Sequence, residues 1–306
     1  MRHNSISRVG IVGAGVIGPR IAYRCLKYGI YVNLHDVSVE ALARADNFIK
    51  ELLHADVAKG QMSGTENQTL QTRLHLCREL EECLAGVQFV IESIPENLSL
   101  KREVFGQIDR LSSPEVLLAT NSSSLPCSRL SNVTKRPEKI INLNFSDPSE
   151  NSLVEVMKGA KTSDETLQSV LSFLKSLEMV PIVTRKEIMG FSFNRIWRST
   201  KREALHLVDG GYIGHEDIDR AWMLNYGTSI GPFGLMDIVG IDVVRDIEMQ
   251  YYRESGRACD KPPKLLDNLI SKGKLGMKSG QGFYSYPDPD YENPDWLLKK
   301  KEWEKD

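Results

Sequence analysis

The motif GAGVIG at residues 13–18 constrains the fold of this chain more than any other feature. It directly follows the short apolar segment SRVGIV and precedes a segment of helical periodicity. Gly13 permits a tight turn, Gly15 lets the backbone approach a pyrophosphate, and Gly18 lets a helix pack against a strand. The N-terminus of that helix attracts the phosphate charge. The motif therefore predicts a dinucleotide site in which the whole turn, with Val16 and Ile17, contacts the cofactor.

Asp36 indicates which dinucleotide is bound. It ends the next strand-like segment, YVNLHD, 18 residues after Gly18. A carboxylate at this point accepts hydrogen bonds from both ribose hydroxyls and repels a 2′-phosphate. The sequence therefore predicts NAD, rather than NADP, as the cofactor.

The hydrophobic pattern changes about two thirds of the way along the chain. In the first part, helical stretches separate apolar runs of strand length, namely QFVIES, VLLAT, KIINLNF, LVEVMKG and VPIVTR. Later segments are mainly helical, among them FNRIWRSTKREALHLV, EDIDRAWMLNY, FGLMDIVGIDVVRDIEMQYY and PPKLLDNLIS. We expect an α/β fold, with a Rossmann-type doubly wound NAD-binding domain at residues 1–188 and an all-helical domain at residues 189–306.

Composition argues against several classes of partner and site. The formal net charge of −2 gives no electrostatic footprint for nucleic acid, and no apolar run reaches the ~18 residues of a membrane span. The first residues run almost directly into a strand, so we expect a cytoplasmic protein. Five cysteines without paired spacing and six histidines without ligand spacing predict free thiols and no metal site.

Several further motifs, taken together in chain order, resemble the L-3-hydroxyacyl-CoA dehydrogenase family. They span residues 9–286 and are GAGVIG, IPENLSLK, ATNSSSL, LVEVMKG, MGFSFNR, GPFGLMDIVGID and GKLGMKSGQGFYSY. The resemblance implies an NAD-binding domain followed by a helical domain that forms a homodimer. It also implies an active site in the cleft between the two domains, where a small-molecule substrate binds.

The resemblance also assigns roles to single residues. It places Glu96 and Lys101 near the nicotinamide half of the cofactor, which Asn121 also contacts. It gives Ser123 a hydrogen bond to the substrate oxygen and lets Asn194 face the same oxygen.

The family's catalytic histidine has no counterpart here. In the family it lies in an HFFNP-like string, and an ungapped count from Ser123 brings that position to Asn144 in the string NFSDP, with Pro148 matching the string's proline. The resemblance makes Glu155 the carboxylate that orients and charges the histidine. The chain therefore keeps the carboxylate of the family's dyad and carries an amide in place of the imidazole.

An amide at this position changes the chemistry, because a carboxamide binds an alcohol or ketone but cannot take up the hydroxyl proton. Losing a positioned general base costs on the order of 10²–10⁴ in rate. One alternative proton acceptor is Glu155, bridged to the substrate by a water held by Asn144, and the loop carboxylates Asp147 and Glu150 are others. A hydrogen-bonding cradle with slower hydride chemistry is a second possibility. A third is an NAD-containing lyase or hydrolase, or a catalytically weak NAD- or ligand-binding protein.

The helix after Asn194 bears on the substrate. Trp197, Arg198 and Lys201 follow at positions that share a helix face with Asn194. Two cations and an indole suit a compact anionic or aromatic substrate. The lysine-rich stretch that often binds coenzyme A in the family is not evident here. A free hydroxy- or keto-acid is therefore an alternative to a coenzyme A thioester, as in the family's gulonate dehydrogenase and diketone reductase members. We predict an NAD-dependent oxidoreductase acting on the CH–OH group of a small acidic substrate.

Overall fold

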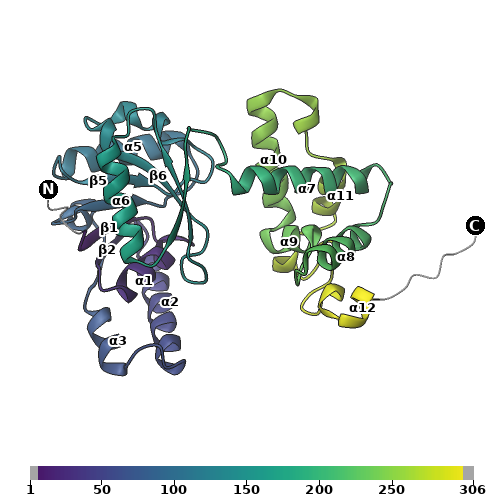
Figure 1. Ribbon diagram of the computed structural model, residues 1–306, viewed down its shortest axis with the longest axis horizontal. Helices are drawn as coiled ribbons and strands as arrows, with labels where there is room; N and C mark the ends of the chain where they lie inside the picture. The colour runs from purple at the N-terminus through teal and green to yellow at the C-terminus, as the bar shows by residue number, and fades with distance from the viewer. Residues whose placement is uncertain (1–5, 299–306) are drawn as a thin grey trace, which may run out of the picture. The chain divides into compact units, whose positions relative to one another are not determined.

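The computed structural model describes residues 6–298, which form two compact units that divide after Asn194 (Figure 1). The first unit is an α/β unit built on one sheet, and the second is helical. This arrangement confirms the predicted fold class. Residues 299–306 of the predicted helical domain, which form the charged run KKKEWEKD, lie outside the described residues.

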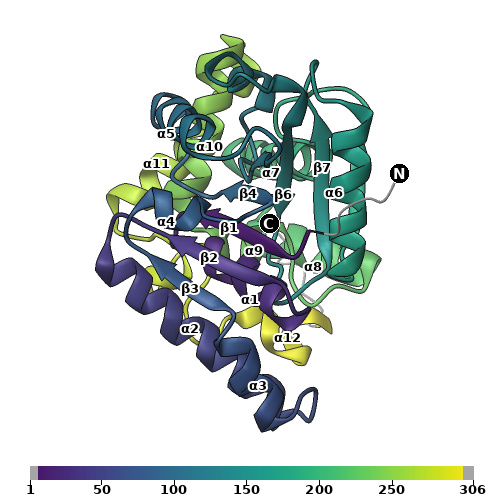
Figure 2. The same ribbon diagram turned by 90° about the vertical axis from the view of Figure 1, so that its left-hand side faces the viewer.

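The first unit contains an eight-stranded sheet with the order β3-β2-β1-β4-β5-β6-β7-β8 (Figure 2). Its strands are β1 (Arg8–Val12), β2 (Tyr31–His35), β3 (Leu74–Cys77), β4 (Phe89–Glu92), β5 (Leu117–Thr120), β6 (Ile140–Phe145), β7 (Leu153–Lys158) and β8 (Val180–Thr184). Neighbouring strands run parallel except β6 and β7, which are antiparallel and place Asn144 directly opposite Glu155. Seven strands match the predicted apolar runs, and β3 was not predicted.

Helices cover both faces of this sheet, which explains why its strands read as continuous apolar runs. The helices are α1 (Gly18–Lys27), α2 (Val39–Ala58), α3 (Gly64–Gln71), α4 (Leu80–Leu84), α5 (Leu98–Leu111) and α6 (Asp164–Ser176). One buried cluster joins Ile21, Ile49 and Phe173 of α1, α2 and α6 to the strands. A second buried cluster joins Leu84 and Phe105 of α4 and α5 to the strands.

The second unit packs its helices around a core of its own. They are α7 (Phe193–Asp209), which begins at the end of the first unit, α8 (His215–Tyr226), α9 (Pro232–Val239), α10 (Ile241–Ser255), α11 (Lys264–Ser271) and α12 (Pro294–Leu298). The core contains Leu205, Phe233 and Ile241. None of the helices between residues 6 and 298 has both the length and the apolar composition that a bilayer crossing requires.

One predicted helix of this unit is wrong. The segment FGLMDIVGIDVVRDIEMQYY was expected to form a single helix, but it is divided at Gly240 into α9 and α10. Gly240 has φ +100°, which a helix cannot accommodate. The apolar periodicity continues across the break, so it gave no sign of the change in direction.

Candidate active site

A cavity of about 610 Å³ lies where the carboxyl ends of the parallel strands meet the glycine-rich turn. Its lining includes six residues that the sequence assigns to the cofactor: Gly13, Gly15, Val16, Ile17, Asp36 and Asn121. Gly18 is buried behind the turn, and Glu96 and Lys101 do not line this cavity. The size and the position outside the strand ends are those of a dinucleotide site.

The turn requires glycine for two different reasons. Gly13 has φ +114°, and a Cβ atom there would lie 2.5 Å from the carbonyl oxygen of Ser93. A Cβ atom on Gly15 would instead meet nothing within 4 Å. Gly13 is therefore needed to form the turn, whereas the space above Gly15 is where a pyrophosphate can approach the backbone. The residues present fit NAD.

Asp36 closes the turn against the second strand. Its Oδ2 accepts a hydrogen bond from the backbone N–H of Ala14 at 2.8 Å, and its Oδ1 accepts one from Ser38 at 2.9 Å. Each oxygen keeps lone-pair capacity for a ribose hydroxyl. Among the described residues that line the cavity there is no lysine or arginine to neutralise a 2′-phosphate, which supports the preference for NAD.

A smaller cavity of about 260 Å³ shares Ile17 and Asn121 with the cofactor cavity. The four residues predicted to be catalytic all line it: Ser123, Asn144, Glu155 and Asn194. Asn121 is fixed between the cavities, because its Oδ1 accepts a hydrogen bond from the backbone N–H of Phe145 at 2.9 Å. Polar side chains from four segments of the chain, namely the loop after β5, strands β6 and β7, and the start of α7, thus surround a space next to the cofactor cavity.

Asn144 and Glu155 form the central contact of this smaller cavity. The Nδ2 atom of Asn144 donates a hydrogen bond to Oε2 of Glu155 at 3.1 Å. An ionised carboxylate only accepts hydrogen bonds, so the amide must turn its NH₂ group toward Glu155. This orientation leaves Oδ1 of Asn144 available as an acceptor for another group.

The other oxygen of Glu155 holds the start of α7. Its Oε1 accepts hydrogen bonds from the backbone N–H of Ser192 at 3.0 Å, from the Ser192 hydroxyl at 2.6 Å, and from the backbone N–H of Phe193 at 3.0 Å. The preceding residue, Phe191, has φ +51°, an uncommon conformation for a bulky side chain. Glu155 therefore has four donors and anchors a strained turn. Nothing in the sequence spacing pointed to Ser192.

Glu96 and Lys101 belong to a polar network around Glu92. The Nζ atom of Lys101 lies 2.6 Å from Oε1 of Glu92 and 3.3 Å from Glu96, and both Glu92 and Lys101 are buried. Burial raises the pKa of Glu92 above its ordinary value, although Lys101 opposes the shift. Glu92 was missed as a site residue, although its place at the end of a buried strand was a usable signal.

Glu96 contacts the serine-rich loop after β5. It accepts hydrogen bonds from the hydroxyls of Ser122 and Ser124. Burial alone would raise its pKa, but these hydrogen bonds and Lys101 outweigh burial and hold the pKa below the ordinary value. Glu96 therefore positions the loop that carries Ser123.

The loop carboxylates considered as alternative proton acceptors lie away from the smaller cavity's lining. Asp147 accepts a hydrogen bond from Nε of Arg20 at 2.9 Å and another from the Ser149 hydroxyl at 2.5 Å. Burial would raise the pKa of Asp147, but these contacts lower it overall. Glu150 is exposed. Neither residue lines the cavity.

The predicted substrate-binding residues lie on α7 within the helical unit. Arg198 contacts Glu248 at 2.9 Å and Asp260 at 3.0 Å. Lys201 is buried, and its Nζ lies 3.0 Å from Glu248. Trp197 packs against the core of the unit. Both cations thus have carboxylate partners within their own unit, and their role in substrate binding stays a prediction.

Two family models match nearly the whole chain. One, described as 3-hydroxyacyl-CoA dehydrogenase, NAD binding domain, matches residues 8–188. The other, described as 3-hydroxyacyl-CoA dehydrogenase, C-terminal domain, matches residues 190–286.

Individual proteins are similar over the same length. A probable 3-hydroxybutyryl-CoA dehydrogenase of Bacillus subtilis is 33% identical, over 92% of this chain and 98% of the relative. A 5-formyl-3-hydroxy-2-methylpyridine 4-carboxylate 5-dehydrogenase of Mesorhizobium japonicum is 28% identical, over 92% of this chain and 91% of the relative. The solved structure of a diketoreductase superposes with a TM-score of 0.82 at 30% identity, over 92% of this chain and 100% of that one.

Proposed function

Because this chain belongs to the 3-hydroxyacyl-CoA dehydrogenase family, we propose that it interconverts a secondary alcohol and a ketone without an imidazole at the substrate oxygen. Membership makes the chain an NAD-dependent oxidoreductase, and NAD, when bound, accepts or returns the hydride. The observation that carries the proposal is the pair of cavities that share Ile17 and Asn121. Ser123, Asn144 and Asn194 line the smaller cavity and would hold the reacting oxygen beside the cofactor.

Asn144 would favour the alcohol over the ketone as the bound form. Because Glu155 holds its Nδ2 atom, the Oδ1 atom is left to accept a hydrogen bond from a substrate hydroxyl. A protonated imidazole, by contrast, would donate to a ketone oxygen. The amide thus orients an alcohol for hydride loss but contributes no proton transfer, so we expect slow turnover.

The hydroxyl proton needs an acceptor when the C–H electron pair leaves with the hydride. Glu155 is our prime candidate, because it is the carboxylate in the lining of the smaller cavity. Its two oxygens already accept four hydrogen bonds, which occupy the lone-pair sites that a carboxylate offers. The proton would therefore pass to Glu155 through a bridging water, or to solvent water itself, at a rate below that of a positioned imidazole.

The substrate we propose is a small acidic alcohol or ketone rather than a coenzyme A thioester. The 260 Å³ cavity suits a compact molecule. The relatives named above include a dehydrogenase of a pyridine carboxylate and a diketoreductase of dicarbonyl compounds, so the family is not restricted to thioesters.

The part that α7 plays in recognising this acid is open to a direct test. We propose that Trp197, Arg198 and Lys201 contribute to binding the acid. Replacing Arg198 by Gln should raise KM for an acidic substrate about tenfold and leave KM for its neutral amide unchanged. A fall in thermal stability without any change in KM would instead assign Arg198 to its ion pairs with Glu248 and Asp260.

A second candidate is a protein that keeps NAD as a structural cofactor, either as a lyase or hydrolase or as a ligand-binding protein. The amide at position 144, in a site otherwise built for proton transfer, favours it.

We also propose that the protein is a cytoplasmic homodimer and that the boundary between its two domains falls between residues 188 and 189.

One assay separates the two candidates. The purified protein would be incubated with NAD and a panel of free hydroxy acids and hydroxyacyl-CoA thioesters while NADH absorbance is followed. We expect NADH from at least one free hydroxy acid, and none in a Gly15→Val control that blocks the pyrophosphate. If no member of the panel yields NADH and the protein retains NAD that does not exchange, the cofactor is structural.

A further inference from the structure

Three potential metal ligands meet at the edge of the sheet, away from the two cavities described above. They are the imidazole of His75, the thiol of Cys77 and the carboxylate of Glu82, and one ligand atom of each lies within 4.8 Å of the other two. His75 and Glu82 are exposed, whereas Cys77 is buried. No histidine or cysteine pairing at this position suggested a metal site from the sequence.

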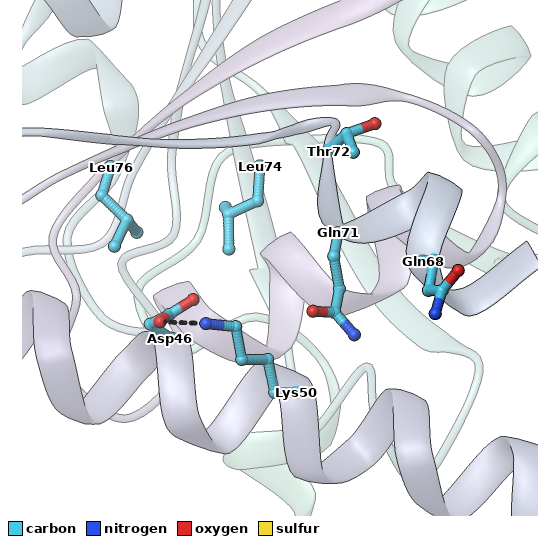
Figure 3. Close-up of a pocket in the computed structure, with 7 residues that line it drawn as sticks. All are labelled: Asp46, Lys50, Gln68, Gln71, Thr72, Leu74 and Leu76. Atoms are coloured by element: carbon cyan, nitrogen blue, oxygen red, sulfur yellow. Dashed lines mark hydrogen bonds and ion pairs between the residues drawn. The ribbon is translucent and has the colours of Figure 1, made fainter. Parts of the chain in front are cut away.

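The pleat of β3 explains why these side chains converge. Leu74 and Leu76 point from β3 toward α2, where they line a cavity beside the ion pair of Asp46 and Lys50 (Figure 3). Since successive side chains of a strand alternate between its faces, His75 and Cys77 project together to the opposite face.

Helix α4 brings the third ligand to that face. It packs against β1, β2 and β3, and Glu82 is the central one of its five residues. The strand thus supplies two ligands and the helix one.

The neighbouring thiol of Cys83 hydrogen-bonds with Cys77 and also with backbone carbonyl groups inside the sheet. Its Sγ atom donates to the carbonyl oxygens of Asn33 at 3.4 Å and Ile11 at 3.7 Å, inside the sheet. Cys77 contacts the carbonyl oxygen of His75 at 3.7 Å and the thiol of Cys83, and coordination would replace both contacts. Cys77 is therefore the sulfur ligand of the two.

We propose that His75, Cys77 and Glu82 bind a divalent transition-metal ion, with Zn²⁺ the best match. A set of one sulfur, one nitrogen and one oxygen is of the kind that Zn²⁺ accepts, whereas Mg²⁺ and Ca²⁺ prefer oxygen ligands. The ligand atoms lie within 4.8 Å of one another, so small side-chain shifts suffice to form metal–ligand bonds of about 2.0–2.3 Å. The exposed side chains of His75 and Glu82 can move inward without disturbing the core. Water would complete the coordination.

A metal ion at this position would tie the edge strand to α4. Leu80, the first residue of α4, lines the cofactor cavity, and His35, whose Nδ1 lies 3.2 Å from the carbonyl oxygen of Cys77, lines it as well. The ion would thus stabilise the wall at the adenosine end of that cavity. Because the ion binds the folded chain, Zn²⁺ should raise the midpoint of thermal unfolding.

The test uses the reduced full-length protein and Co²⁺, which reports thiolate coordination through a charge-transfer absorption band. We expect one Co²⁺ per chain with this band, displaced by one equivalent of Zn²⁺. Cys77→Ser should abolish the band and weaken Zn²⁺ binding about 100-fold or more, because changes in the second shell alone cost about 10–100-fold. Matched controls are Cys259→Ser and His54→Ala, which change an exposed cysteine and an exposed histidine elsewhere.

Variants at two exposed positions test the proposal even if the Cys77 variant misfolds. His75→Ala and Glu82→Gln should each weaken Zn²⁺ binding at least about tenfold, shift the cobalt spectrum and leave circular dichroism unchanged. The proposal fails if the wild-type protein gives no charge-transfer band with Co²⁺. It also fails if the band survives in both exposed variants, because the metal would then bind elsewhere.

Discussion

The cofactor cavity and the smaller cavity beside it share Ile17 and Asn121, yet they depend on the sequence in different ways. The cofactor cavity depends on the backbone of its glycine turn, where a Cβ atom on Gly13 would meet the Ser93 carbonyl oxygen. The smaller cavity depends on individual side chains, and Asn144, at the position where the family resemblance implies a histidine, carries an amide that cannot titrate. We infer that NAD binding and proton transfer can change independently in this fold.

The largest effect should come from the turn that forms the cofactor cavity. Gly13→Ala places a Cβ atom 2.5 Å from the Ser93 carbonyl oxygen at φ +114°. We expect the free energy of unfolding to fall by about 1–3 kcal/mol and NAD affinity to fall about 100-fold or more, since the pyrophosphate contacts depend on this turn. Chemical denaturation and calorimetric titration with NAD measure the two quantities.

Gly15→Ala is the matched control for that variant. Its Cβ atom meets nothing within 4 Å, so the free energy of unfolding should change by less than about 0.5 kcal/mol. NAD binding should weaken all the same, because the methyl group occupies the approach of the pyrophosphate. Equal stability losses in the two variants would contradict the distinction between a glycine that forms the turn and a glycine that admits the ligand.

Asp36 allows a test of how the cofactor cavity selects NAD over NADP. Asp36→Ala removes a charged acceptor, and hydrogen bonds to charged groups contribute about 1.5–3 kcal/mol, which corresponds to roughly a 10–100-fold loss of NAD affinity. NADP affinity should not fall in parallel, because the repulsion of the 2′-phosphate disappears as well. Titration with both nucleotides measures the ratio, and an unchanged ratio would remove Asp36 from cofactor selection.

Ser192 should give the smallest effect and separates two roles of Glu155. Ser192→Ala removes the 2.6 Å hydroxyl contact to Glu155 and keeps the carboxylate. We expect a loss of about 0.5–1.5 kcal/mol in the free energy of unfolding, with kcat unchanged because the carboxylate stays in the cavity lining. Glu155→Gln should lower both quantities. If Glu155→Gln leaves turnover unaffected, Glu155 serves only to anchor the start of α7.

The sequence predicted those parts of the molecule that depend on local pattern. Seven strands, the glycine turn and the assignment of Asp36 to the cofactor site followed from apolar runs and spacing. β3 was missed because LHLC has four residues and alternates with an exposed histidine, and with it the cluster of His75, Cys77 and Glu82 was missed. The break at Gly240 was missed because apolar periodicity continues through it.

Contacts between distant residues account for the rest. The pairing of Asn144 with Glu155 could be anticipated through the family resemblance, and the antiparallel register of β6 and β7 provides it. The contact of Glu155 with Ser192, 37 residues away, has no local signature. The helix face that Arg198 shares with Asn194 predicted that this cation could bind substrate. Its ion pair with Glu248, 50 residues away, could not be predicted from that local pattern.

The pH dependence of kcat/KM for alcohol oxidation, compared between the wild-type protein and Asn144→His, tests the central claim most directly. A histidine at this position takes the hydroxyl proton only when neutral, so activity of the variant should fall as the pH drops through about 6.5. The account predicts that the variant gains this acidic limb together with a rate increase on the order of 10²–10⁴, and that the wild-type protein lacks the limb. A wild-type profile that already has the limb, combined with no gain in the variant, would show that another titrating group serves the substrate oxygen and would contradict the account.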